Sequence, residues 1–209
     1  MTQQWGFMNV RDAANPVNGL DYAIRQRISE MGGLMIVKII SVNISSRTVD
    51  VSPMVDQVTP DGTPIPHSTI HEVPYGYDQA GGCLIKIDPV AGDIGVIGCS
   101  SRDITRVKRT WKSATPQTLR SHHLSDAIYL CTLQAASTPS HIISISDNGG
   151  LVISSPLVVK IEADAQITGN LSVGGNVTAT GDVKAGSISL KSHIHSGVQT
   201  GGGTTGGPQ

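Results

Sequence analysis

The sequence predicts a mainly β protein: an N-terminal OB-fold barrel, then a homotrimeric intertwined β-helix needle that ends in a metal-bound apex. Three observations predict this fold class. Residues 159–185 alternate between apolar and polar side chains, 168–185 repeat a six-residue unit, and 34–99 hold several short strand-like runs separated by turns. Period-2 alternation is typical of a β-strand with one buried and one solvated face.

Composition agrees with a β protein and excludes other classes. The chain has 209 residues with 24 Gly, a net charge of −1 and 3% aromatic residues. No long basic run indicates nucleic-acid binding, and no apolar run is long enough for a membrane-spanning helix. Cys83, Cys99 and Cys131 are odd in number and far apart, so we expect no structural disulfides. This cysteine usage also favours synthesis in a reducing cytosol. The N-terminus shows no signal-peptide pattern, so we expect none.

Residues 1–33 are predicted to form an N-terminal segment with one short helix over about 19–31. Asn18 can supply the N-cap, apolar residues recur at helical spacing, and Gly32-Gly33 can end the helix. A helix this short needs support from packing, so we expect its apolar face to dock on something.

Residues 34–110 are predicted to form the barrel. The OB fold is the first choice for short strands with Gly/Pro turns. OB barrels that bind oligonucleotides use a basic groove and stacking aromatics, but this region has few of either, so we interpret it as an assembly module. The expected strands cover 34–42, 48–55, 70–74, 83–88 and 93–99, with a loop over 57–66.

Residues 111–140 are predicted to be a linker between barrel and needle, with a turn or helix near 125–128. A local positive patch precedes it. This patch is either a solvated edge or an electrostatic contact to a neighbouring subunit; it consists of Arg102, Arg106, Lys108 and Arg109.

Residues 141–187 are predicted to form a triple-stranded β-helix. One straight strand over 159–185 would be roughly 90 Å long, so the segment must be broken or wound. The repeat x-Gly-(Asn/Asp)-apolar-polar-apolar begins at Thr168, Gly174 and Thr180, and such units must stack to bury their apolar face. Three chains around one axis would bury it and leave no open sheet edge. A lone β-solenoid and an exposed irregular tail are the alternatives.

Residues 188–209 are predicted to form the apex, where His193 and His195 share one side of an extended chain. A single His-x-His is a weak metal signal. Three chains would bring six imidazoles together, which suits an octahedral ion such as iron(II), nickel or cobalt better than zinc. Asp182 and Lys184 are either solvated charges near the tip or, at a threefold apex, ligands of a small ion.

No catalytic motif stands out, so we expect neither enzymatic activity nor a small-molecule substrate. A nucleophile elbow, a P-loop and a paired-carboxylate arrangement are all missing from the sequence. His67 and His71 have the spacing of a zinc helix, but the prolines around them argue against a helix.

The barrel, the hexad repeat and the run from Asp182 to His195, with its Ser-His-Ile-His-Ser, resemble the central spike of contractile-tailed bacteriophages, the family of baseplate assembly protein V. The resemblance implies a homotrimer whose apex holds one iron through His193 and His195 of three chains. It also implies calcium and chloride inside the apex, near Asp182 and Lys184. The implied partners are baseplate hub and tail tube proteins. The implied location is the virion, after synthesis in the host cytoplasm, and the implied action is piercing of the host outer membrane when the sheath contracts.

Three other functions fit parts of the pattern. A puncturing spike of a contractile secretion system would be mechanically equivalent. A trimeric fibre tip should present aromatic residues, and 186–209 contain none. A polysaccharide-cleaving β-helix enzyme needs a carboxylate pair, whereas Glu162, Asp164 and Asp182 are scattered.

Overall fold

The structure is a computed structural model that describes residues 15–29, 31–59, 61–197 and 201. It is mainly β with few helices, which confirms the predicted β-rich class. The chain divides into two compact units between Pro156 and Leu157, and each unit is described by itself. No helix within the described ranges is long and apolar enough to cross a membrane.

The N-terminal helix α2 (Pro16–Ser29) begins earlier than the sequence predicts. Its N-cap is Asn15, whose Oδ1 accepts a hydrogen bond of 2.7 Å from the Val17 N–H, so the assignment of Asn18 as cap is wrong. Pro16 occupies the first helical position, where its missing N–H costs no hydrogen bond. Leu20 and Ile28 remain 62% exposed, so nothing described in this chain covers the apolar face.

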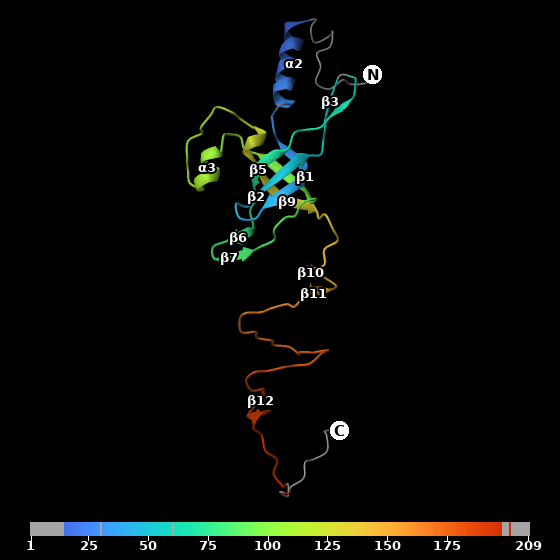
Figure 1. Ribbon diagram of the computed structural model, residues 1–209, viewed down its shortest axis with the longest axis vertical. Helices are drawn as coiled ribbons and strands as arrows, with labels where there is room; N and C mark the ends of the chain where they lie inside the picture. The colour runs from blue at the N-terminus through green and yellow to red at the C-terminus, as the bar shows by residue number, and fades with distance from the viewer. Residues whose placement is uncertain (1–14, 30, 60, 198–200, 202–209) are drawn as a thin grey trace. The chain divides into compact units, whose positions relative to one another are not determined.

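Five antiparallel strands form the central sheet of the first unit, in the order β5-β2-β1-β8-β9 (Figure 1). The isolated bridge between Tyr75, just beyond β5, and Tyr129 in β9 brings the two outer strands together. The strand β1 pairs with β8 through its first half and with β2 through its second half. The bounds are β1 Leu34–Asn43, β2 Thr48–Pro53, β5 Ile70–Pro74, β8 Ile94–Cys99 and β9 Ala127–Gln134.

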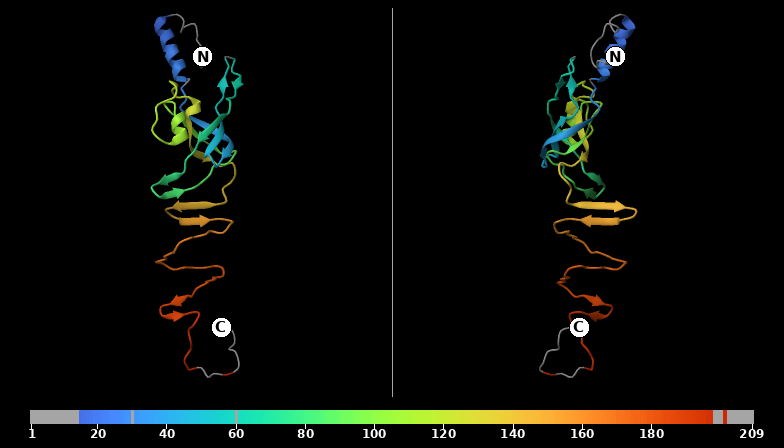
Figure 2. Two further views of the ribbon diagram at one scale, coloured as in Figure 1. Left: turned by 60° about the vertical axis from the view of Figure 1, so that its left-hand side comes forward. Right: turned by 90° about the vertical axis from the view of Figure 1, so that its right-hand side faces the viewer.

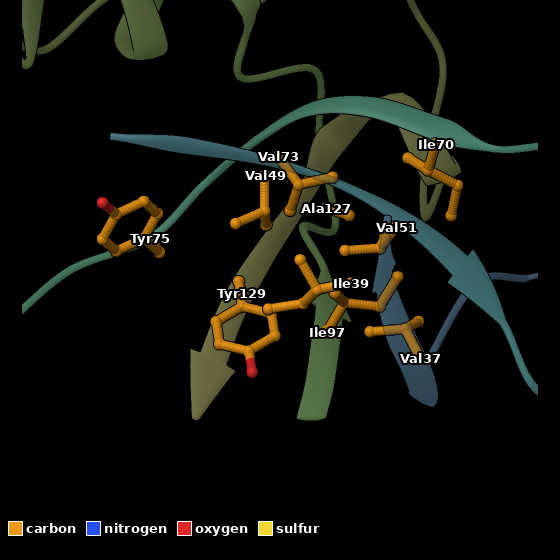
Figure 3. Packing of buried hydrophobic residues seen from close by; sticks show 10 residues of the cluster. All are labelled: Val37, Ile39, Val49, Val51, Ile70, Val73, Tyr75, Ile97, Ala127 and Tyr129. Atoms are coloured by element: carbon orange, nitrogen blue, oxygen red, sulfur yellow. The ribbon is translucent and has the colours of Figure 1, made fainter. Parts of the chain in front are cut away.

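The hydrophobic core lies inside this curved sheet (Figure 3). Alternate residues of each strand point inward, as period 2 requires, so Val37 and Ile39 of β1 are 0% and 1% exposed. Val49 and Val51 of β2 and Ile97 of β8 are buried to the same degree. The remaining members are Ile70, Val73, Tyr75, Ala127 and Tyr129.

Two small hairpins extend from the sheet. The segment predicted as a loop over 57–66 contains β3 (Gln57–Val58) paired with β4 (Pro64–Ile65). The strand expected over 83–88 is shorter, because β7 (Cys83–Ile85) ends where its pairing with β6 (Asp78–Ala80) ends.

The prediction of a linker over 111–140 is wrong for its second half. The strand β9 pairs with β8 along most of its length, so the sheet extends well beyond residue 110. Its Ala127 and Tyr129 belong to the core, and this long-range pairing leaves no mark on the local sequence pattern. The segment between β8 and β9 carries α3 (Thr105–Thr110) and the 3₁₀ helix η1 (Leu124–Asp126).

The strands β10 (Ile142–Ser146) and β11 (Gly150–Ser154) form an antiparallel hairpin near the end of the first unit. In the second unit, residues 157–183 contain no strand, and the chain reverses direction between extended passes (Figure 2). The short strands β12 (Lys184–Ala185) and β13 (Ile188–Ser189) follow. Every residue from 156 to 188 is exposed in the single chain, and the predicted triple-stranded β-helix over 141–187 stays a prediction about three chains.

Candidate metal site at the apex

The histidine pair follows directly on the β12–β13 hairpin. Ala185 pairs with Ile188 across a two-residue turn, in which Gly186 has φ +61°, a value that glycine adopts without strain. The Leu190 N–H donates a hydrogen bond of 2.8 Å to the Val183 carbonyl and extends the pairing. The hairpin thus fixes the backbone that leads into the two histidines.

The hydroxyl of Ser189 organises the turn after this hairpin. It accepts hydrogen bonds from the backbone N–H groups of Lys191 and Ser192, at 3.2 and 3.1 Å, and one of 3.0 Å from the Ser192 hydroxyl. Asp182 Oδ1 accepts a further, longer bond of 3.3 Å from the Lys191 N–H. Serine side chains commonly bind the backbone of nearby residues in this way, and here they reverse the chain before the histidines.

The Ser189 carbonyl then orients His193. It accepts two hydrogen bonds from this residue, one of 3.0 Å from the backbone N–H and one of 2.9 Å from the ring nitrogen Nδ1. A carbonyl only accepts, so Nδ1 carries the proton and Nε2 of the neutral ring keeps its lone pair. This is the hydrogen bond that commonly orients a metal-binding histidine.

The ring of His195 lies beside that of His193. Their centroids are 5.1 Å apart and their planes are inclined by 76°, so the two rings make an edge-to-face contact. Both residues are exposed in the single chain. Imidazole is a ligand type that transition-metal ions accept, so these two residues could contribute to holding one.

One chain does not complete a coordination sphere. Within the described ranges no group of three or more His, Cys, Asp or Glu side chains could hold a metal. A structural ion needs at least four ligands and an octahedral one needs six. His193 and His195 of one chain therefore do not by themselves fill the coordination sphere of a metal ion.

The backbone before the histidines differs from the one that the sequence predicts. The sequence predicts that His193 and His195 share one side of an extended chain, and the structure places two turns before them, at Gly186 and after Ser189. Asp182 bonds to the Lys191 backbone, and Lys184 pairs with Ser189 in the β-ladder. Ser189 is not among the residues predicted for this site, although the Ser189-x-x-Ser192 spacing is a signal for such a turn.

A second polar cluster lies in the first unit and fastens the segment between β8 and β9. Arg120 Nη2 donates to Asp103 Oδ1 at 3.0 Å, and its Nε donates to Asp126 Oδ2 at 2.6 Å. Hydrogen bonds from Thr105 lower the pKa of Asp103. Burial alone would raise the pKa of Asp126, but bonds from Arg120 and from the Ile104 N–H outweigh it, so that this pKa also falls.

The predicted positive patch lies on the same segment. Arg102, Arg106 and Arg109 are exposed, whereas Lys108 is partly buried and its Nζ donates to the Ser125 carbonyl at 2.8 Å. Burial of Lys108 lowers the pKa of its ammonium group. The patch therefore combines three exposed arginines with one partly buried lysine that is bonded to the Ser125 carbonyl.

His67 and His71 do not share a helix, because the strand β5 begins at Ile70. His71 Nδ1 instead lies 3.1 Å from Asp50 Oδ2 on the neighbouring strand β2. This arrangement agrees with the prediction that the pair forms no zinc helix.

Two family comparisons agree with this architecture. Residues 35–132, which span all five strands of the sheet apart from the ends of β1 and β9, match the family described as phage protein Gp138 N-terminal domain. Residues 187–209, which contain the histidine pair, match the family described as GpV Apex motif. No curated protein matches the chain at a significant level.

Both families are features of phage baseplate spikes, so the chain is a structural protein of the phage tail baseplate. Matches to both families, one over the central sheet and one over the C-terminal segment, confirm the resemblance to phage central spike proteins expected from the sequence.

Proposed function

We propose that three copies of this chain form the central tail spike that pierces the host outer membrane when the tail sheath contracts. The observation that carries this proposal is the exposed apolar side of residues 157–183. Ile161, Leu171 and Val177 are 70%, 71% and 72% exposed, and no strand of their own chain pairs with them. Three identical chains would bury such a face around a shared axis.

The first unit supports an attachment role at the other end of the spike. We propose that its sheet is an OB barrel, because five antiparallel strands in the order β5-β2-β1-β8-β9, joined again through Tyr75 and Tyr129, suit a small closed barrel. Arg102, Arg106 and Arg109 are available for contacts with baseplate hub and tail tube proteins.

At the apex we propose one iron per trimer, held by His193 and His195 of each chain. The iron would supply a rigid crosslink between three chain ends, where few side chains are large enough to hold the chains together. The Ser189 carbonyl supports this role, because it fixes the tautomer that leaves Nε2 of His193 free. Asp182 and Lys184 stay candidates for a second ion such as calcium or chloride.

The proposed action is mechanical and needs no catalytic residue. The contracting sheath supplies the work, and the spike needs a stiff axis and a narrow front. Both matched families are phage features, which favours a phage spike over a secretion-system spike and over a fibre tip.

Native mass spectrometry and metal analysis of the full chain test this proposal together. We expect a trimer with one metal ion per three chains, and we expect His193→Ala to lose the metal. His141→Ala is the matched control, because His141 is also exposed and also has a bonded ring nitrogen, at 2.9 Å from the Ser155 hydroxyl. A wild-type protein that is monomeric at micromolar concentration contradicts the spike, and one metal per chain contradicts the shared site.

A further inference from the structure

The β10–β11 hairpin has two unlike faces. Cross-strand partners point to the same side of an antiparallel pair, so the register Ile143↔Ile153 and Ile145↔Leu151 gathers four large apolar side chains on one face. The opposite face carries Ile142 and Val152 together with three serines, at positions 144, 146 and 154.

Nothing described in the chain covers the apolar face. Ile143, Ile145, Leu151 and Ile153 are 72%, 82%, 63% and 56% exposed. An isolated two-stranded hairpin is marginally stable in water, so this one needs a partner. The outer edges of β10 and β11 also carry unpaired backbone groups, which can pair with other chains unless they are covered.

Identical copies fit this face better than an unlike partner does. From 127 to 159 the sequence has a single Lys, Arg, Asp or Glu, which is Asp147 in the hairpin turn. Depletion of charge is typical of the interior of a permanent homo-oligomer. The proposed trimer already brings copies together at His193 and His195, which do not fill a coordination sphere in one chain, so the same copies are the occupant that we assign to this face.

Apolar side chains are also larger here than near the apex. The hairpin face consists of Ile and Leu, whereas the inward series of the last repeat reads Gly181, Val183, Ala185. Hydrophobic stabilisation scales with the apolar area removed from water. Association should therefore bury more apolar area, and gain more free energy per residue, at the hairpin than at the tip.

We infer that the apolar face of the β10–β11 hairpin is the main association surface between copies of this chain, and that the apex metal orders the tip without holding the trimer together. The inference rests on the proposed trimer and assigns its stability to one surface. The apex then needs only to be locked, because the chains are already joined at the hairpin.

The test compares four forms of the full chain by native mass spectrometry and analytical ultracentrifugation. Ile145→Asp should give predominantly monomer at about 10 μM, since three buried carboxylates would face one another around the axis. Ser144→Asp puts the same charge on the other face of the same strand and should remain trimeric. The double variant His193→Ala, His195→Ala should remain trimeric without metal.

Circular dichroism and thermal unfolding of Ile145→Asp show whether the barrel is still folded. The milder variant Ile145→Ser, which uses the residue type of the opposite face, should weaken the trimer partially. A trimeric Ile145→Asp overturns the inference. So does equal dissociation by Ser144→Asp, or complete dissociation of the double histidine variant. A monomeric wild type instead overturns the proposed function itself, which separates the two failures.

Discussion

The five-stranded sheet and the segment 157–188 use the same alternating pattern in opposite ways. In β2, every second residue is buried against strands of its own chain, and Val49 and Val51 are 1% and 0% exposed. In 157–188 the alternation is longer, yet every residue is exposed. Alternation tells which side of a strand needs burial but not which chain supplies the cover. The five-stranded sheet covers its own apolar side, whereas the described part of the chain leaves the apolar side of 157–188 uncovered.

The most direct test of this difference truncates one apolar side chain in the sheet and one in the segment 157–188. Ile39→Ala removes a side chain that is 1% exposed and should lower the free energy of unfolding of the barrel by about 3–4 kcal/mol. Ile161→Ala should leave the unfolding transition of the first unit unchanged. It should instead lower the denaturant concentration at which half of the trimer has dissociated. Denaturant unfolding followed by barrel circular dichroism, with ultracentrifugation in parallel, separates the two. An equal effect of both variants on the barrel would contradict the division.

The next largest loss of stability is expected in the polar cluster of Arg120, Asp103 and Asp126. Arg120→Met should cost about 3 kcal/mol, the lower end for a broken buried pair, because Arg120 keeps 29% side-chain exposure while the Asp103 and Asp126 side chains are 0% and 1% exposed. Urea unfolding checks the value. The exposed Arg106→Met is the control and should change stability little, since Arg106 lies on the surface and donates to the exposed Thr115 hydroxyl.

The same carboxylates make barrel stability depend on pH. The pKa values of Asp103 and Asp126 are lowered in the folded chain, so the unfolded chain binds protons first as pH falls. Their contribution is present at neutral pH and is lost progressively below about pH 4. Thermal unfolding between neutral pH and about pH 3 measures this. Asp126→Asn should flatten the dependence, whereas an unchanged slope would show that other groups control it.

The smallest effect is expected at the apex turn. Asp182→Ala removes the acceptor for the Lys191 N–H and should destabilise the turn by about 0.5–1 kcal/mol. Metal retention during stepwise chelation reports this loss, and Asp164→Ala is the control on the same polar series. A complete loss of metal from Asp182→Ala would indicate instead that this carboxylate is itself a ligand.

The strands were predictable where local patterns decide them. The runs that became β1, β2, β5 and β8 alternate and end at turn residues, so their existence follows from sequence. The pairing of β9 with β8 was not predictable, because it joins segments separated by α3 and η1. At the apex, the sequence indicated His193 and His195, but the carbonyl that orients His193 depends on the Ser189 turn.

The sequence alone determined that the chain is mainly β, that a long apolar side needs cover, and that two histidines lie close together near the C-terminus. These properties are local, since period 2 and i, i+2 spacing depend on neighbouring residues. The tertiary structure decided that β9 completes the sheet, that Arg120 fastens the segment before it, and which face of the β10–β11 hairpin is apolar. Those outcomes depend on strand register and on contacts between distant segments, which backbone pairing and burial select together.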